Sequence, residues 1–253
     1  MGPVEITVLL VWSFAVSFAG GMVGLVLGNL RLPVVVLIGS SAAAAAGANV
    51  AISGAAALTS TIVHIRNGRF NPRIFLWMAP SSFVGAVAGG LISGVLPDRI
   101  LLGAISIVVL YGAVEVWRYQ RPKATDDAPR VQKGNILIEA VLVGFAVGLL
   151  GGFVGLILGS LRLPAMLKYM GMSPKSAVGT NSAAGVVVGI GGLLGHLPGG
   201  VDWTIFLIGS AAAVPGAFFG SRFTGRLPDD TLVKAMAVVL VITGLAMAGQ
   251  AIF

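Results

Sequence analysis

The sequence contains little charge and no cysteine, and these absences exclude several classes of protein. Only 10% of the 253 residues are charged and 57% are hydrophobic, whereas soluble domains carry about 25% charged residues. A chain of this composition cannot remain dissolved as a globule. Without cysteine it can form no disulfide, no thiolate nucleophile and no thiolate metal site. The composition therefore indicates a polytopic membrane protein.

The chain also lacks the residue patterns of an intramembrane enzyme. It has two histidines, His64 and His196, both at the ends of apolar segments, and no His-Glu-x-x-His, Gly-x-Ser-x-Gly or Walker sequence. We therefore expect no enzymatic activity, no cofactor and no bound metal. The net charge of +7 comes from basic residues in the loops between apolar segments. That placement is typical of topology signals and does not indicate binding to nucleic acid.

Apolar segments long enough to cross a bilayer run through the whole chain, since a hydrocarbon core of about 30 Å needs roughly 20 helical residues. These segments are 6–30, 74–96, 100–117, 136–161, 203–224 and 231–253. Residues 33–65 and 164–196 each have room for a short element plus a full span, and we expect a break at Gly47 and at Gly179. Alternating strand patterns are absent, so the predicted fold class is all-α.

One stretch of sequence occurs twice. Residues 20–33 (GGMVGLVLGNLRLP) return as residues 151–164 (GGFVGLILGSLRLP), at an offset of 131. Further matches extend the repeat to about 115 residues, and they pair Gly47 with Gly179, Asn49 with Asn181, His64 with His196, Gly85 with Gly216 and Gly89 with Gly220. We therefore expect a first membrane repeat at 1–117, a polar linker at 118–134 and a second membrane repeat at 135–253.

The positions of the basic residues predict how the two repeats are oriented. If each glycine-rich stretch dips into the membrane as a hairpin and three crossings follow, three basic clusters fall on one side and only Arg99 on the other. The clusters are Arg66, Arg69 and Arg73; the five basic residues of the linker; and Arg222, Arg226 and Lys234. The alternative, four crossings per repeat, leaves eight of these basic residues on one side and four on the other, so the hairpin arrangement is favoured. An odd number of crossings per repeat makes the repeats inverted, and the same follows if each hairpin crosses twice, so the number of crossings stays open. The linker is then cytoplasmic and both termini lie outside.

Each repeat places one arginine, Arg31 or Arg162, within an otherwise apolar segment. Such a residue costs roughly 2.5–3.5 kcal/mol near the bilayer centre on insertion scales, so each should face a cavity or a counter-ion. All carboxylates lie near the ends of predicted spans or in the linker. The counter-ion can therefore be the substrate, because a guanidinium matches the oxygens of a small anion. The alternative is that both arginines reach the membrane surface.

Glycine and polar residues near the arginines admit two interpretations each. Gly20-Gly21 and Gly151-Gly152 can break a helix and direct backbone amides at an anion, or they can serve close helix packing. The paired glycines 24/28, 155/159, 85/89 and 216/220 have packing spacing, which we favour for the last two pairs. The polar residues Asn49, Thr180 and Asn181 can bind substrate or bond between helices. For His64 and His196 we favour a place at the membrane interface over a proton relay.

These patterns together resemble the sulfite exporter (TauE/SafE-type) permeases. The resemblance rests on the glycine-rich break with its later proline, residues 173–181 (SPKSAVGTN), a helix ending in His196, residues 199–203 (GGVDW) and a Leu-Pro-Asp before the last span. It covers nearly the whole chain and is strongest in the second repeat. The chain departs from the family pattern in its glycine spacing and in carrying an arginine two residues before each proline.

The resemblance implies a multi-pass permease of the bacterial cytoplasmic (inner) membrane that moves sulfite, a sulfonate such as sulfoacetate, or a related sulfur oxyanion, mostly outward. A passive anion channel and a non-transporting membrane subunit are the alternatives. The expected partners are the small anion and the lipid bilayer, and a homodimer is left open. The candidate substrate-binding residues are Arg31, Arg162, Gly20, Gly21, Gly151, Gly152, Asn49, Thr180 and Asn181.

Overall fold

The computed structural model describes residues 1–91, 98–118, 135–154 and 156–252, which form helices and contain no strand. The first repeat forms α1 (Pro3–Val23), α2 (Gly28–Ile38), α3 (Ala42–Arg66), α4 (Pro72–Leu91) and α5 (Asp98–Trp117). The second forms α6 (Asn135–Val154), α7 (Gly159–Lys168), α8 (Pro174–His196), a 3₁₀ turn (Leu197–Gly199), α9 (Trp203–Thr224) and α10 (Asp229–Ile252). The all-α prediction is confirmed. Most of the linker, residues 119–134, lies outside the described residues.

Six of these helices are long and apolar enough to cross a membrane. They are α1, Ala44–Arg66 of α3, Ile136–Phe153 of α6, α8, α9 and α10. Two apolar helical segments are shorter, α2 and Ile105–Trp117 of α5. The elements occur in the same order in both repeats: a long helix, a short helix after a break, and three further helices.

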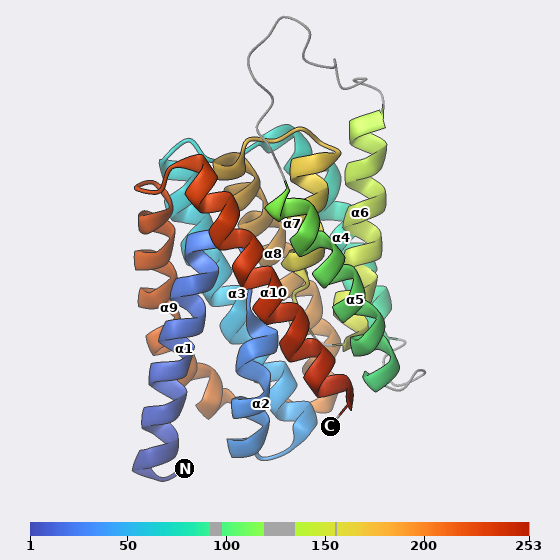
Figure 1. Cartoon of the computed structure of the whole chain (residues 1–253). Helices are drawn as coiled ribbons and strands as arrows, with labels where there is room; N and C mark the ends of the chain where they lie inside the picture. Colours follow the sequence, from blue (N-terminus) through green and yellow to red (C-terminus); the bar gives the residue numbers. More distant parts are fainter. Residues whose placement is uncertain (92–97, 119–134, 155, 253) are drawn as a thin grey trace, which may run out of the picture.

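Helix pairing joins the two repeats to each other. The central pair is α3 with α8, and around it α1 packs along α9, α6 along α4, and α5 along α10 (Figure 1). Every one of these pairs takes one helix from each repeat. Exchanging the repeats leaves the set of pairs unchanged, because α1 corresponds to α6, α4 to α9 and α5 to α10. The two repeats therefore build one interlocked bundle.

Glycines on α4 and α9 bring the outer helix pairs into backbone contact. A Cβ added at Gly85 or Gly89 would overlap backbone atoms of α6, at Phe145 and Leu149. One at Gly216 or Gly220 would overlap backbone atoms of α1, at Phe14 and Phe18. The packing role that the sequence favours for these pairs is confirmed, since small residues let membrane helices approach closely.

The first helices of the two repeats, α1 and α6, run in opposite directions in Figure 1. In Figure 1, α1 rises from the N-terminus at the bottom, whereas α6 starts at the top and descends. Both termini lie at the lower end. The α3–α4 loop, the α9–α10 turn, the end of α5 and the start of α6 lie at the upper end (Figure 1).

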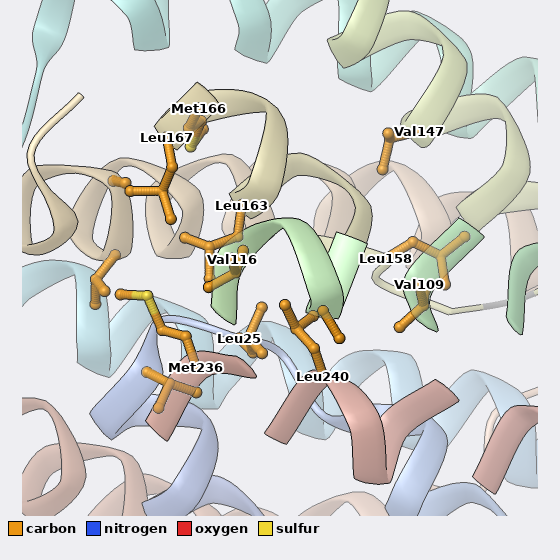
Figure 2. Close-up of a cluster of buried hydrophobic side chains, with 14 of the residues drawn as sticks. Leu25, Val109, Val116, Val147, Leu158, Leu163, Met166, Leu167, Met236 and Leu240 are labelled. Atoms are coloured by element: carbon orange, nitrogen blue, oxygen red, sulfur yellow. The ribbon is translucent and has the colours of Figure 1, made fainter. Parts of the chain in front are cut away.

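The largest apolar cluster lies where α5, α7 and α10 meet the breaks of the two repeats. Figure 2 shows Val116 of α5, Leu163 of α7 and Leu240 of α10 gathered together, with Leu25 and Leu158 from the two breaks. All are buried. The breaks are thus packed into the protein, which is the setting in which non-helical backbone is tolerated at membrane depth.

The break predicted at Gly47 and Gly179 is wrong. Both glycines lie inside long helices, α3 and α8, and each one faces the loop that follows the other helix. A Cβ at Gly47 would approach the Gly200 carbonyl, and one at Gly179 would overlap the Arg69 carbonyl. The short helices end instead at Gly39 and Tyr169. These two glycines therefore admit a neighbouring loop and do not interrupt their own helices.

Candidate functional site

The chain leaves α1 through a tight reversal of direction. Helix α1 ends at Val23, and Gly24 follows in the left-handed conformation, with φ of 69°, which favours glycine. The Leu25 amide donates to the Gly20 carbonyl at 2.9 Å. The second repeat forms the matching bond from the Leu156 amide to the Gly151 carbonyl at 2.8 Å. Both repeats thus interrupt their first helix in the same way, and a short helix follows.

The double glycines do not themselves break the helices, which corrects one of the two interpretations given above. Gly20 and Gly21 lie in the last turns of α1, and Gly151 and Gly152 in those of α6. A Cβ at Gly20 or Gly151 would overlap the returning chain at Leu25 or Leu156. A Cβ at Gly21 or Gly152 would overlap the neighbouring helix at Ala217 or Ala86. Their task in this structure is close packing.

The interruption also separates Gly24 from Gly28, so these two glycines do not share the face of one helix. Gly24 lies against the backbone of Val178, and Gly28 lies against the side chains of Asn49 and Ser53. In the second repeat, Gly159 packs against Asn181 in the same way as Gly28 packs against Asn49. Its spacing partner, Gly155, lies outside the described residues.

Arg31 is buried on α2, and each of its three guanidinium nitrogens donates to a neutral group. Its side chain is 1% exposed. Nε donates to Asn49 Oδ1 at 3.0 Å, Nη1 to Ser17 Oγ at 3.3 Å, and Nη2 to Ser53 Oγ at 2.6 Å. Asn49 in turn donates through Nδ2 to the Gly28 carbonyl at 3.0 Å. Arg31 and Asn49 therefore connect the start of α2 to α1 and α3.

Arg162 occupies the matching place on α7 but has fewer partners. It is 0% exposed, and its Nε donates to Asn181 Oδ1 at 3.0 Å. Its Nη1 and Nη2 atoms are buried and have no hydrogen-bond partner within the described part of the chain. Neither arginine forms an ion pair with a described carboxylate. The alternative in which both arginines reach the membrane surface is therefore not supported by their burial.

Asn181 joins the two breaks. Its Nδ2 donates to the Gly159 carbonyl at 3.1 Å in its own repeat and to the Gly24 carbonyl at 2.8 Å in the other. With its bond to Arg162, this one side chain contacts both interruptions and the buried guanidinium. Of the two interpretations for Asn49 and Asn181, the structure thus shows bonding between helical segments, and it places both beside the arginines.

Thr180 is engaged away from the arginines. It is fully buried, and its hydroxyl accepts a hydrogen bond from the Asn71 backbone amide at 2.9 Å. Asn71 Oδ1 caps the start of α4 by accepting from the Ile74 amide at 3.1 Å. Thr180 therefore fixes the loop before α4, and the structure does not bring it together with the other candidates.

The two histidines differ in burial. His64, at the end of α3, is 0% exposed, and both of its ring nitrogens lack a hydrogen-bond partner among the described residues. His196, at the end of α8, is partly exposed. His64 is thus enclosed in the bundle and His196 is not, and the interfacial placement favoured by the sequence stays a prediction for both.

Serine residues near Arg31 are the part of the site that sequence reasoning missed. Arg31, Ser17, Ser60 and Ser182 line a small cavity of about 20 Å³, together with apolar residues of the first break. A space of this size holds about one water molecule. The signal was present in the repeat, because the serines beside Arg31 have no serine at the matching positions of the other half.

Residues 9–247 match the model of the protein family described as "Sulfite exporter TauE/SafE". Because the match covers nearly the whole chain, the protein belongs to this family, and it is a multi-pass protein of the cell membrane. The resemblance seen in the sequence is confirmed. The shared class is that of membrane transporters.

Curated relatives carry names of the same class. The chain is 33% identical over 118 residues to "Probable membrane transporter protein YunE" of Bacillus subtilis, which covers 45% of this chain and 42% of that protein. It is 24% identical to YdhB of Bacillus subtilis, covering 90% and 91%, and 26% identical to YfcA of Escherichia coli K12, covering 95% and 85%. Both are also named probable membrane transporter proteins. No solved structure matches this chain.

Proposed function

We propose that this protein is a secondary permease for a small sulfur oxyanion, sulfite or a sulfonate such as sulfoacetate, which it exports from the cell. The family name supports a sulfite-type substrate, and its relatives are named only as probable transporters. The observation that carries the proposal is the pair of buried arginines without a carboxylate partner in the described chain. An uncompensated buried cation is costly, and a transported anion removes that cost when it binds.

The architecture that we propose is a pair of inverted repeats. The opposite course of α1 and α6, and the helix pairs that survive exchange of the repeats, support this arrangement. The segments bearing two of the basic clusters, and the helix ends that flank the linker, share one end of the bundle, away from the termini. Under the positive-inside rule that end, with the linker 118–134, is cytoplasmic. In such transporters the substrate site lies near the midplane between the repeats, beside interrupted helices.

The proposed binding centre consists of Arg31 and Arg162 with Asn49 and Asn181, held by the two breaks. The double glycines contribute by letting the backbone fold back and helices approach, so we assign them a supporting role and not a direct contact. A cavity for about one water is smaller than a sulfur oxyanion, so the anion enters when the two repeats move apart at this centre.

Flux through proteoliposomes of the purified protein tests the function. The panel is sulfite, thiosulfate, sulfoacetate, taurine, a dicarboxylate and chloride, with the Arg31→Gln/Arg162→Gln double variant as the control. Saturable flux of one sulfur anion that disappears in the folded double variant is the expected result. Flux dominated by chloride that does not saturate would identify a channel. Absence of flux for every anion would favour a non-transporting subunit.

A further inference from the structure

We propose that the two arginines have different tasks: Arg162 binds the anion through Nη1 and Nη2, whereas Arg31 is a structural residue that holds the first break. This inference rests on the proposed function, because it assigns the anion to one position within that centre. Arg31 and Arg162 occupy matching positions of the repeat and are both buried. They differ in their hydrogen-bond partners, and this difference is the basis for assigning them two tasks.

A count of donors separates the arginines. A guanidinium has five N–H donors. In Arg31 each of the three nitrogens has a partner oxygen, from Asn49, Ser17 and Ser53. In Arg162 only Nε has a partner, so the four N–H groups on Nη1 and Nη2 are buried without one among the described residues. Buried polar groups almost always find partners, so an exception of this kind calls for an explanation. The partner that we assign to these N–H groups is the transported anion.

The sequence explains why the second repeat lacks these partners. By the offsets of the repeat, Ser17 corresponds to Gly148, and Ser53 corresponds to Gly185. Glycine has no side chain to accept a hydrogen bond from the guanidinium. The serine hydroxyls that complete Arg31 therefore have no counterpart beside Arg162.

The cavities beside the breaks of the two repeats also differ in their polar lining. Ser60 and Ser182 line the cavity beside Arg31, and their counterparts in the repeat are Gly192 and Val50. Those two line an apolar space with Gly151, Gly152, Leu156, Ile157 and Val188. Hydroxyl groups and room for a water thus accompany Arg31, where each guanidinium nitrogen has a partner. Arg162 does not line the apolar space, and no hydroxyl group among the described residues bonds to its Nη atoms.

The free edge of Arg162 also defines the class of ligand. Two adjacent Nη atoms present parallel N–H groups that match two oxygens borne by one atom, as in sulfite, a sulfonate or a carboxylate. A monatomic anion such as chloride cannot use both bonds with the same geometry. We therefore expect the site to prefer an oxyanion over chloride.

Binding to single variants tests the assignment. Purified wild type, Arg162→Gln and Arg31→Gln are titrated with sulfoacetate, sulfite, acetate and chloride, and the shift in thermal unfolding midpoint gives the affinity. Arg162→Gln should weaken binding of the sulfur oxyanion more than Arg31→Gln does, because only Arg162 contacts the anion in this assignment. Loss of two charge-assisted hydrogen bonds in Arg162→Gln should weaken binding by about 100-fold. Arg162→Lys, which keeps the charge without the fork, should bind weakly as well.

Other outcomes are equally decisive. Equal loss in Arg31→Gln and Arg162→Gln would overturn the division of tasks while leaving a two-arginine site in place. Loss in Arg31→Gln and in Ser60→Ala, with Arg162→Gln unchanged, would move the anion to the cavity beside Arg31. If Arg162→Gln does not fold, the folded Arg162→Lys variant decides, and its normal affinity would contradict the proposal. Failure of the proposed function differs from all of these, because wild type would then show no saturable flux of a sulfur oxyanion in proteoliposomes.

Discussion

The two halves of the molecule match closely at their helix contacts and differ at their centres. Around α1 and α6, glycines at matching positions of α9 and α4 let the backbones approach with no side chain between them at those positions. Around the arginines, two serines of the first half are replaced by two glycines in the second. At a backbone contact only glycine fits, so the residue type cannot change between the two copies. The side chains that hydrogen-bond to an arginine can differ between the copies. The duplicated scaffold is thus common to both halves, and in our proposal only one of them binds the anion.

The largest expected effect comes from breaking the common scaffold. Gly89→Leu and Gly220→Leu each place a side chain where a carbonyl of the neighbouring helix lies, at Leu149 and Phe18. We expect each to lower the free energy of unfolding by about 3 kcal/mol or more, to a similar extent in the two halves. Gly249→Leu is the matched control, because nothing lies within 4 Å of its added Cβ. Denaturant unfolding in detergent measures this, and wild-type stability in both variants would show that the close packing is not required.

Substituting the two asparagines should lower stability by different amounts in the two halves, and this effect should be smaller than that of the glycine substitutions. Asn181→Ala removes bonds to Arg162 and to the carbonyls of both breaks, whereas Asn49→Ala removes bonds to Arg31 and one carbonyl. Each buried group left unsatisfied costs about 1–3 kcal/mol. The Asn181 variant should therefore be the less stable of the two by thermal unfolding. The reverse order would argue against Asn181 as the link between the breaks.

Removing the serines should make the first half resemble the second. Ser17→Ala/Ser53→Ala leaves two nitrogens of Arg31 without their present partners, at a cost of about 2 kcal/mol for two hydrogen bonds. In this variant a sulfur oxyanion should gain a second binding position, seen as a higher stoichiometry in titration calorimetry. Ser13→Ala is the control, because Ser13 is buried on the same helix with no hydrogen-bond partner in the described chain. An unchanged stoichiometry would contradict the view that serines keep Arg31 from binding an anion.

Substituting the two histidines should give the smallest effect, a difference between the halves in the pH dependence of flux. A buried imidazole without a hydrogen-bond partner among the described residues can take up a proton when its surroundings open, whereas His196 already reaches the surface. His64→Gln should therefore flatten the dependence of flux on pH between 6 and 8, and His196→Gln should retain it. Identical pH profiles for wild type and both variants would remove histidine from the transport cycle.

Several features of the fold could be predicted from the sequence because they depend on composition and repetition. Low charge and long apolar segments predict a helical membrane protein, and the spacing of Gly85, Gly89, Gly216 and Gly220 predicts helix contacts. The position of the breaks could not be predicted from the double glycines. A helix ends where a residue adopts the left-handed conformation, and four glycines between 20 and 28 could each do so. The structure places that conformation at Gly24, and Gly20 accommodates the reversal.

At the candidate site, the two arginines and their asparagines follow from the repeat, but their unequal environments do not follow from either residue alone. Ser17 and Ser53 lie 14 and 22 positions from Arg31 and on two different helices, and they come together only when α1 and α3 pack around α2. The clue that the sequence offers is a difference between the halves, serine against glycine at two matching positions. Its meaning depends on which side chains face the guanidinium.

A structure of the protein with its transported anion bound tests the account most directly. The account predicts that two oxygens of the anion accept hydrogen bonds from Nη1 and Nη2 of Arg162, while Arg31 keeps its bonds to Ser17, Ser53 and Asn49. An anion held beside Arg31 and Ser60, or one bound away from both arginines, would contradict it.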